Sequence, residues 1–397
     1  MKVLDKQEVC TGCGACLNIC PKEAIVMKAD EKGFAYPYIE EDKCVKCGLC
    51  KKVCPALKSR ETREKRDIDA FIAKNSLEER LESSSGGIFS FLSAKILKQQ
   101  GTVYGAKFDE NQNIVHGRAK DEVEVKEFRG SKYSQSSIED TYKKVWVDLL
   151  SEQYVYFSGC PCQIAGLYSF LEMKKCSTEK LITQDFICHG VASPRFYQDY
   201  LKFYEKKYRA KAKTVNFRGK PKLGKFQNMI IEFENGKKYQ AISTNQDIFY
   251  YHFLNNLVLR PSCYQCSYAS LDRIADVTLA DCFHIKEDMK DFDDRRGISF
   301  ILASTDKGKD LMKVKDSSDE VQIKTVSVWD YMQVNMKMPT RKPALYEAFW
   351  KEYGNKGFLS AISKFGNYNM KNRIKKLVII IINIVGIEEF VKCKVRK

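Results

Sequence analysis

The sequence of 397 residues contains 16 cysteines, and eight of them form a repeat near its beginning. The segment Cys10–Pro21 has the spacing C-x2-C-x2-C-x3-C-P, and the same spacing returns in Cys44–Pro55. In such a pair, three thiolates of one segment bind a 4Fe-4S cluster together with the fourth cysteine of the other segment. A zinc ribbon is the alternative, but its paired C-x2-C knuckles lack a third cysteine at the same step. The predicted ligands are Cys10, Cys13, Cys16 and Cys54 for the first cluster, and Cys20, Cys44, Cys47 and Cys50 for the second.

The other eight cysteines are spaced irregularly. Cys263 and Cys266 form a single C-x2-C pair, which is compatible with zinc, an iron–sulfur cluster or a redox dithiol. Cys162 and Cys188 follow segments that we predict to be parallel strands, and the ends of such strands open onto a common crevice, where the pair at Cys263 can join them. The eight are Cys160, Cys162, Cys176, Cys188, Cys263, Cys266, Cys282 and Cys393.

Strand and helix patterns alternate after residue 66, which favours an α/β region with functional loops at the strand ends. A hairpin of two strands around Glu234-Asn235-Gly236 is expected to add antiparallel structure. The predicted strands are Ile68–Ala73, Thr102–Phe108, Tyr154–Ser158, Leu181–Cys188, Met229–Phe233 and Lys237–Ile242, and the predicted helices are Ile88–Leu97, Ile164–Leu171 and Phe196–Tyr204. Residues 58–66 are a charged linker, so residues 1–57 form a separate ferredoxin-like domain.

The composition indicates a soluble globular protein, with 44% hydrophobic and 30% charged residues. The formal charge of +16 comes from two segments, because residues 195–240 carry +9 and residues 360–397 carry +7. Neither segment contains a nucleic-acid-binding motif, so we expect no nucleic acid partner. Anionic cofactors, an acidic protein or an anionic membrane surface fit this charge better.

The two ends of the chain bear on its location. The start, Met-Lys-Val-Leu-Asp, has no signal-peptide pattern, so we expect a cytoplasmic protein whose cysteines hold metal. Near the other end, the apolar stretch Leu377–Val385 is too short for a membrane span of about 20 residues. Basic residues flank it, so residues 360–397 form either a packing element with a solvated end or a peripheral membrane contact.

Several segments in order along the chain together resemble the beta-subunit family of coenzyme F420 hydrogenases and dehydrogenases. The segments are Cys10–Pro55, Ser83–Phe89, Arg129–Ser136, Gly159–Leu167, Ile187–Val191, and Cys263–Cys266 with Ala275–Asp281. The resemblance implies an α+β protein, in which the two-cluster ferredoxin domain precedes an α/β flavin-binding region with added antiparallel strands. Its family domains would span residues 67–150 and 151–345.

The resemblance also implies FAD and a third 4Fe-4S cluster beside it. Cys162, Cys188, Cys263 and Cys266 stand at the cysteine positions of the family and would ligate this cluster; two pairs of buried free thiols are the alternative. Cys160 and Cys282 replace other residue types and are expected to be spare thiols. Ala280 and His284 stand where the family usually has glycine, so the substrate pocket is expected to differ.

The expected flavin site lies at the start of the helix Ile88–Leu97, where N–H groups favour a pyrophosphate. Lys132 would pair with a phosphate or with charge on the reduced flavin, and His189 would relay a proton. The alternatives without a function are an ordinary helix cap for the serines, a solvated side chain for Lys132 and an uninvolved loop residue for His189. His116 is expected at the surface. The predicted cofactor-binding residues are Ser84, Ser85, Gly86, Gly87, Ser131, Lys132, Tyr133 and Gln135, and the predicted catalytic residues are Lys132 and His189.

Clusters transfer single electrons and a flavin delivers two as a hydride. The sequence therefore predicts an iron–sulfur flavoprotein oxidoreductase that connects a ferredoxin or another redox protein with a small organic acceptor. The alternative is a non-catalytic electron-transfer subunit that connects a partner enzyme to ferredoxin.

Overall fold

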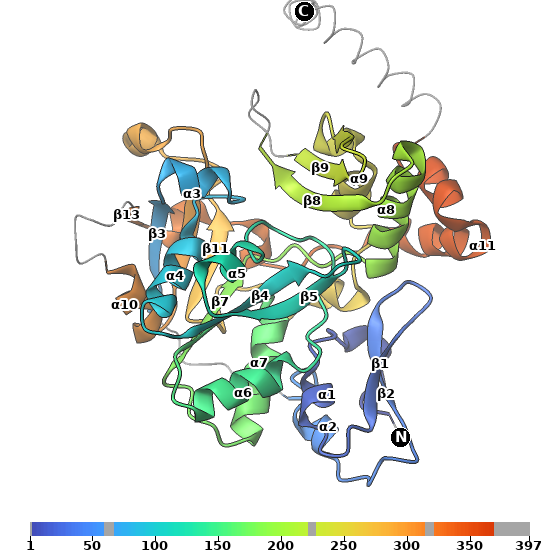
Figure 1. The fold of residues 1–397 in the computed structure, drawn as a ribbon, viewed down its shortest axis with the longest axis horizontal. Helices are drawn as coiled ribbons and strands as arrows, with labels where there is room; N and C mark the ends of the chain where they lie inside the picture. Colours follow the sequence, from blue (N-terminus) through green and yellow to red (C-terminus); the bar gives the residue numbers. More distant parts are fainter. Residues whose placement is uncertain (1, 59–66, 221–227, 314–320, 369–397) are drawn as a thin grey trace, which may run out of the picture.

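The N-terminal cysteine repeat folds as a small module in the computed structural model, which describes residues 2–58, 67–220, 228–313 and 321–368 (Figure 1). The module contains the antiparallel strands β1 (Ile25–Ala29) and β2 (Ala35–Ile39) and the short helices α1 (Ala15–Ile19) and α2 (Leu49–Lys52). Each helix begins inside a cysteine run, directly after a glycine with a positive φ of 75° or 77°. The left-handed backbone at these glycines turns each run sharply into its helix.

The largest element is an eight-stranded mixed sheet. Its four inner strands β11, β7, β6 and β4 are parallel, and the outer strands pair antiparallel to their neighbours. Strands such as β12 are buried along their whole length, as expected where both faces of a sheet are covered. In spatial order the strands are β13 (Gln322–Val326), β3 (Asp69–Lys74), β12 (Ser299–Ala303), β11 (Val277–Asp281), β7 (Leu181–Phe186), β6 (Val155–Ser158), β4 (Thr102–Phe108) and β5 (Ile114–Ala119).

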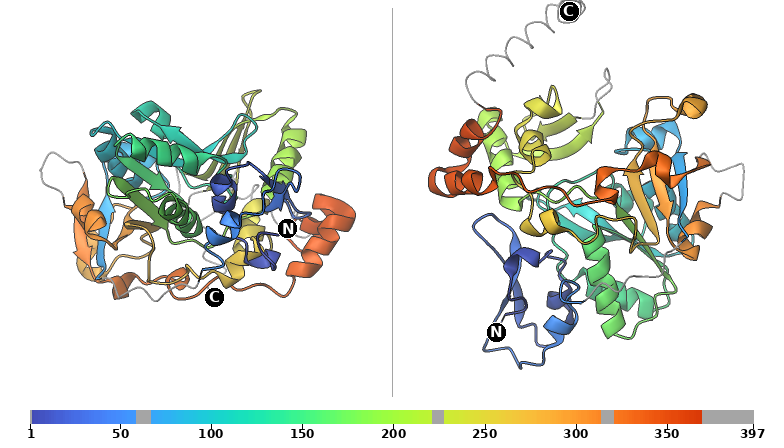
Figure 2. Two further views of the ribbon diagram at one scale, coloured as in Figure 1. Left: turned by 90° about the horizontal axis from the view of Figure 1, so that it is seen from below. Right: turned by 180° about the vertical axis from the view of Figure 1, so that it is seen from behind.

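The helices of this region connect and cover the sheet. The first residue of α7 lies three residues after the end of β6, so this helix and the loop before it lie at the carboxyl edge of the parallel strands. The helices are α3 (Leu77–Leu81), α4 (Ile88–Leu97), α5 (Glu122–Lys126), α6 (Thr141–Leu150), α7 (Pro161–Met173) and α10 (Asp306–Met312). Figure 2 shows the N-terminal module beside this region, and its helix α1 contacts both α6 and α7.

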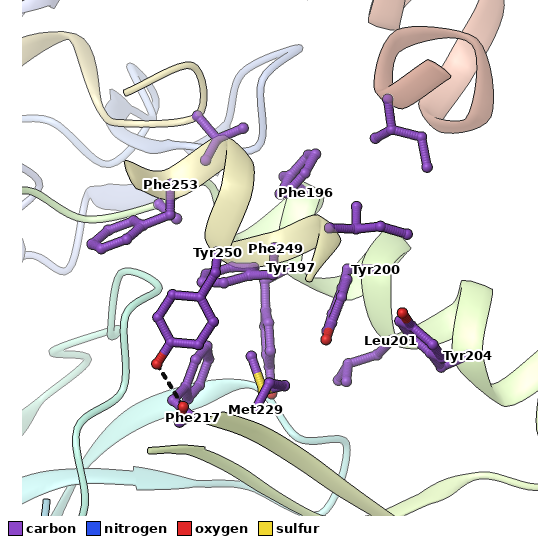
Figure 3. Packing of buried hydrophobic residues seen from close by; sticks show 14 of the residues in the cluster. Phe196, Tyr197, Tyr200, Leu201, Tyr204, Phe217, Met229, Phe249, Tyr250 and Phe253 are labelled. Atoms are coloured by element: carbon purple, nitrogen blue, oxygen red, sulfur yellow. Dashed lines mark hydrogen bonds between the residues drawn. The ribbon is translucent and has the colours of Figure 1, made fainter. Parts of the chain in front are cut away.

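A second, aromatic core lies under the antiparallel strands β8 (Ala212–Gly219), β9 (Asn228–Phe233) and β10 (Lys238–Gln240). The helices α8 (Pro194–Tyr208), α9 (Ile248–Leu254) and α11 (Tyr346–Lys364) contribute to it. Rings from α8 and α9 point toward β8 and β9, and the hydroxyl of Tyr250 donates to the carbonyl of Phe217 at 2.5 Å (Figure 3). This core fixes α8, which follows the loop of Cys188, and α9, which precedes the loop of Cys263 and Cys266.

The predicted fold class, an α+β protein with a ferredoxin-like N-terminal domain, is confirmed. The predicted helix Ile88–Leu97 and strand Thr102–Phe108 have the observed bounds, and the hairpin turns at Gly236, where φ is 77°. The eight-stranded sheet takes strands from both sides of the predicted boundary between residues 150 and 151, so the sheet is not divided at that boundary. The surface position expected for His116 was wrong, because its ring is buried and stacks on Phe157.

The predicted tail lies mostly outside the described residues, including its apolar stretch Leu377–Val385. Among the described helices, none combines the length and apolarity that a bilayer crossing requires.

Candidate functional site

The eight cysteines of the N-terminal repeat gather around two separate cavities. Each cavity contains three cysteines of one run and the last cysteine of the other run, as the spacing predicts. One is lined by Cys10, Cys13, Cys16 and Cys54, and the other by Cys20, Cys44, Cys47 and Cys50. The structure therefore brings together both of the predicted ligand sets.

The chemistry of these donors fits an iron–sulfur cluster. Burial, together with the neighbouring thiols, raises the pKa of Cys13 to about 12 and also raises those of Cys16 and Cys54, so burial disfavours the thiolate forms of these three cysteines unless a cation compensates them. Backbone N–H groups stabilise the thiolate forms, and that of Ala24 donates to the sulfur of Cys20 at 3.4 Å. Such N–H donors to sulfur are among the interactions that tune clusters.

A third group of cysteines lies at the carboxyl edge of the large sheet. Its cavity also contains side chains of Gln135, Arg260 and His189. Within the described residues, no three or more of His, Cys, Asp and Glu are arranged to hold a single metal ion. The cysteines that line this cavity are Cys160, Cys162, Cys188, Cys263 and Cys266.

These five thiols interact closely. Cys160 forms hydrogen bonds with Cys162 and Cys188. The pKa of Cys162 is lowered first by the hydrogen bond from Cys160 and then by the positive charge of the nearby Arg260. Burial and the neighbouring thiols raise the pKa of Cys266 to about 12 and also raise that of Cys263. Cys160, expected to be a spare thiol, therefore lies within the group, whereas Cys282 lines a different cavity.

Helix α7 joins the third cysteine group to the first N-terminal set. Cys162 is the second residue of this helix, and Gly166 follows one turn later. A Cβ atom on Gly166 would lie 3.0 Å from the sulfur of Cys13 and 2.9 Å from the hydroxyl of Tyr142. Because a helix rises 1.5 Å per residue, the two cysteine sites meet α7 at points about 6 Å apart along its axis.

A larger cavity of about 720 Å³ adjoins the third cysteine group. This volume is typical of sites for small organic ligands and cofactors. The two cavities share His189, Asn335, Pro339 and Thr340, so they have a common wall. Asn335 donates to Thr340 at 3.1 Å, and Thr340 donates to the carbonyl of His189 at 2.5 Å. Asp281, Cys282, Phe283 and His284, at the end of β11, line its other side.

Comparison with known proteins identifies the region that supplies the cysteines of the third group and part of the wall of the larger cavity. Residues 152–328 match the family model for the C terminus of the beta subunit of coenzyme F420 hydrogenase/dehydrogenase. This part of the chain belongs to that family. We call residues 152–328 the beta-subunit domain, and it contains Cys162, Cys188, Cys263 and Cys266. The family is one of oxidoreductase subunits.

The N-terminal module precedes the beta-subunit domain, and residues 9–57 match a 4Fe-4S dicluster domain. A second dicluster model matches residues 36–115, but residues 58–115 contain no cysteine, so this match adds no ligand. No curated protein matches the chain. A chain of the xenon-derivatised F420-reducing NiFe hydrogenase complex from Methanosarcina barkeri is similar with a TM-score of 0.44 and 16% identity, over 76% of this chain and 94% of that chain.

Most of the predicted flavin-binding residues lie close together before the beta-subunit domain. Ser84 accepts from the backbone N–H of Ser131 at 2.7 Å, and Ser85 donates to the carbonyl of Ile298 at 2.9 Å. The N–H of Gly86 donates to the hydroxyl of Ser299, and Gly87 precedes α4 with a φ of 75°. The serine and glycine loop is therefore held against the large sheet.

Tyr133 connects this loop to the larger cavity. Its hydroxyl interacts with Ser131 and Arg218, and Arg218 donates to Asp281 at 2.6 Å. Asp281 in turn lines the larger cavity. Gln135 is separate, because its side chain lies at the cysteine cavity and donates to the carbonyl of Thr11.

The two predicted catalytic residues have different surroundings. Lys132 is partly buried, its amine donates to the carbonyls of Arg129 and Gly130 at 3.0 and 3.3 Å, and burial of the amine lowers its pKa to about 7. His189 lines both cavities, and burial lowers its pKa although the side chain of Asn256 and the backbone of Phe253 interact with its ring. Its Nε2 atom is buried and meets the geometric criteria for a hydrogen bond with no described residue.

Sequence reasoning missed Arg260 and the segment from Tyr331 to Arg341, which forms much of the wall of the larger cavity. The signal in this segment was misleading. Residues 332–338 alternate between apolar and polar types, which is typical of a half-buried strand, whereas the structure forms the short 3-10 helix Val334–Met336 there. Nothing in the local sequence distinguishes Arg260 from other arginines.

Proposed function

We propose that the protein is an iron–sulfur flavoprotein oxidoreductase that passes electrons between a ferredoxin-type protein and an organic two-electron acceptor. The wall shared by the third cysteine group and the cavity of about 720 Å³ carries this proposal. It would place a one-electron carrier directly beside an organic cofactor or substrate.

The proposed electron route starts at the surface of the N-terminal module. Cys47 is exposed, and the neighbouring Val45 is 58% exposed, so the set Cys20, Cys44, Cys47 and Cys50 is the accessible one. The set that contains Cys13 comes next, and α7 leads from it to the third group. A redox partner would dock near Cys47, and either direction of flow is compatible with this order.

FAD is proposed to occupy the larger cavity and the path toward Ser84 and Ser131. Arg218 and Tyr133 link Asp281 with Ser131, and a phosphate at this end of the path would replace the hydrogen bond between the N–H of Ser131 and the hydroxyl of Ser84. A bound flavin supplies the exchange between two single electrons and one hydride. Because a hydride equals two electrons and one proton, the buried Nε2 atom of His189 is proposed to hold or move that proton.

The proposal is tested on anaerobically purified protein. We expect about 12 irons, from three clusters of four, and one flavin per chain. Reduced ferredoxin should bleach the flavin absorbance, and a two-electron acceptor should restore it; the panel begins with coenzyme F420 and a nicotinamide. His189→Gln should slow the restoration by about 10²–10⁴-fold while iron and flavin contents stay unchanged.

A non-catalytic electron-transfer subunit is the remaining alternative. It would contain clusters and no flavin, and it would reduce no soluble organic acceptor. Eight irons without flavin would therefore exclude both the third cluster and the proposed enzyme.

A further inference from the structure

Arg260 joins the N-terminal module to the beta-subunit domain. Its side chain is buried, with 1% of its surface exposed. Its Nε donates to the carbonyl of Cys10 at 2.7 Å, and one Nη donates to the carbonyl of Ala35 at 2.9 Å. The other Nη donates to Gln135 at 2.7 Å, and the guanidinium lies 4.4 Å from the ring centroid of Tyr36. Arg260 thus bonds to Cys10 of the first cysteine set and to strand β2, which lines the same cavity.

The same guanidinium also lines the cavity of the third cysteine group. In the part of the chain that the structure describes, no carboxylate forms an ion pair with it. A buried charge is costly unless an opposite charge or hydrogen bonds compensate it, and here neutral carbonyl and amide oxygens provide the only observed acceptors. The anionic groups that can lie nearest to it are the thiolate-bound clusters on its two sides.

The fit around Arg260 is close. A Cβ atom on Gly12 would lie 2.5 Å from the Nε2 of Gln135 and 2.8 Å from a guanidinium nitrogen, and Gly12 has a φ of 68°. Gln135 completes the arrangement by donating to the carbonyl of Thr11 at 3.0 Å. Gly12, Gln135 and Arg260 therefore form one rigid contact between the first and third cysteine sites.

We propose that Arg260 is a positioning residue that fixes the first cluster beside the third cysteine group, and that its charge favours the reduced state of the clusters on both sides. The part that concerns the third cluster rests on the proposed function. The part that concerns the first cluster does not. Reduction adds one negative charge to a cluster, and a nearby cation in a medium of low dielectric constant stabilises that charge strongly.

The second cluster provides an internal control. Its cysteines line a different cavity, which Arg260 does not touch. A change at Arg260 should therefore affect two of three redox couples. A general loosening of the protein would affect all three.

The test is an anaerobic redox titration of the full chain, in which electron paramagnetic resonance follows each cluster. Arg260→Gln removes the charge and Arg260→Lys keeps it. Lys98→Gln removes an exposed cation at the end of α4 and is the matched control. At the wild-type midpoint potential, we expect Arg260→Gln to lower the ratio of reduced to oxidised cluster about tenfold for the first and the third cluster. A tenfold change corresponds to a shift of about 59 mV in the midpoint potential of a one-electron couple. Arg260→Lys should recover most of this loss, and Lys98→Gln should cause none.

Unchanged couples in a fully iron-loaded Arg260→Gln protein would overturn the proposal, as would an equal shift of all three couples. If the Arg260→Gln protein loses iron, the Gln135→Glu protein is titrated instead. The new carboxylate would neutralise the guanidinium, and the bonds of Arg260 to Cys10 and Ala35 would remain. The same two shifts are then expected, and their absence overturns the proposal. A wild-type protein with only eight irons would refute the proposed function, and the shift of the first cluster would still test Arg260.

Discussion

Gly166 lies so close to Cys13 that a Cβ atom on the glycine would come within 3.0 Å of the cysteine sulfur. The same atom would lie 2.9 Å from the hydroxyl of Tyr142, which donates to the carbonyl of Gln163 on α7. Helix α7 can therefore approach the first cysteine set only because this position carries no side chain.

Gly166→Ala should consequently destabilise the protein although alanine is the better helix former. Overpacking costs about 1–3 kcal/mol, which exceeds the gain of about 1 kcal/mol in helix propensity. Gly354→Ala is the control, because a Cβ atom there has no neighbour within 4 Å. Denaturant unfolding should show a loss for Gly166→Ala and no loss for Gly354→Ala, and iron analysis should show weaker retention of one cluster only in the former. Equal stability of the two variants would contradict this close packing.

Serine substitutions should separate the second N-terminal set and the third cysteine group by their iron content. Cys20→Ser and Cys263→Ser should each remove about four of 12 irons, because each cubane needs four thiolates. Cys176→Ser is the control, since this thiol lines none of the three cysteine cavities. Cys160→Ser distinguishes a spare thiol from a ligand: we expect it to keep all irons, and a loss of four would assign Cys160 to the third cluster in place of Cys162.

Filling the larger cavity should remove the organic cofactor without removing iron. Met338 lines this cavity but not the cysteine cavity, so Met338→Trp reduces the free volume on one side of the common wall only. The flavin content should fall at least about tenfold, which corresponds to about 1.4 kcal/mol of binding free energy. Val147→Trp, at a position with 55% exposure on α6, should retain flavin. Full flavin occupancy in Met338→Trp would place the cofactor elsewhere.

Acid should weaken the aromatic core through His252. This side chain is fully buried, its Nδ1 donates to the carbonyl of Ile248 at 2.7 Å, and burial lowers its pKa to about 4. In the unfolded chain a histidine has a pKa of about 6.5, so the unfolded state binds more protons between these values and stability falls as the pH falls. At pH 5 the loss is about 2 kcal/mol for this residue.

His252→Phe should remove most of that loss. The measurement is the free energy of unfolding of wild type and variant at pH 7.5 and pH 5. The value at pH 7.5 reports the change in packing, and the difference between the two pH values isolates protonation. An unchanged difference would show that His252 does not contribute to acid sensitivity.

The ligand sets of the N-terminal module were predictable because they depend on local spacing. Each run places two cysteines on the turn before a short helix and the third as the second residue of that helix, so local geometry brings Cys10, Cys13 and Cys16 together. The position of Cys162 and Cys188 was also predictable, since both follow parallel strands and the carboxyl ends of such strands share one edge.

The remainder of the site depends on contacts between distant segments. Arg260 bonds to Cys10 and Ala35, which precede it by more than 200 residues, and no local pattern marks such a contact. Gln135 stands in the segment that resembles a flavin loop, yet its amide lies at the cysteine cavity. Asn335 lines the larger cavity together with residues at the ends of β11 and α9, which are distant from it in the sequence.

The exposure of Cys47 also makes the three cysteine groups unequal toward oxygen. Oxidants reach sulfur and iron at a surface site before they reach a buried one. The cavity around Cys20, Cys44, Cys47 and Cys50 would therefore lose its iron first in air, whereas the four cysteines of the first set are all buried. Loss of this outer site would disconnect the inner redox centres from their partner before those centres are themselves damaged.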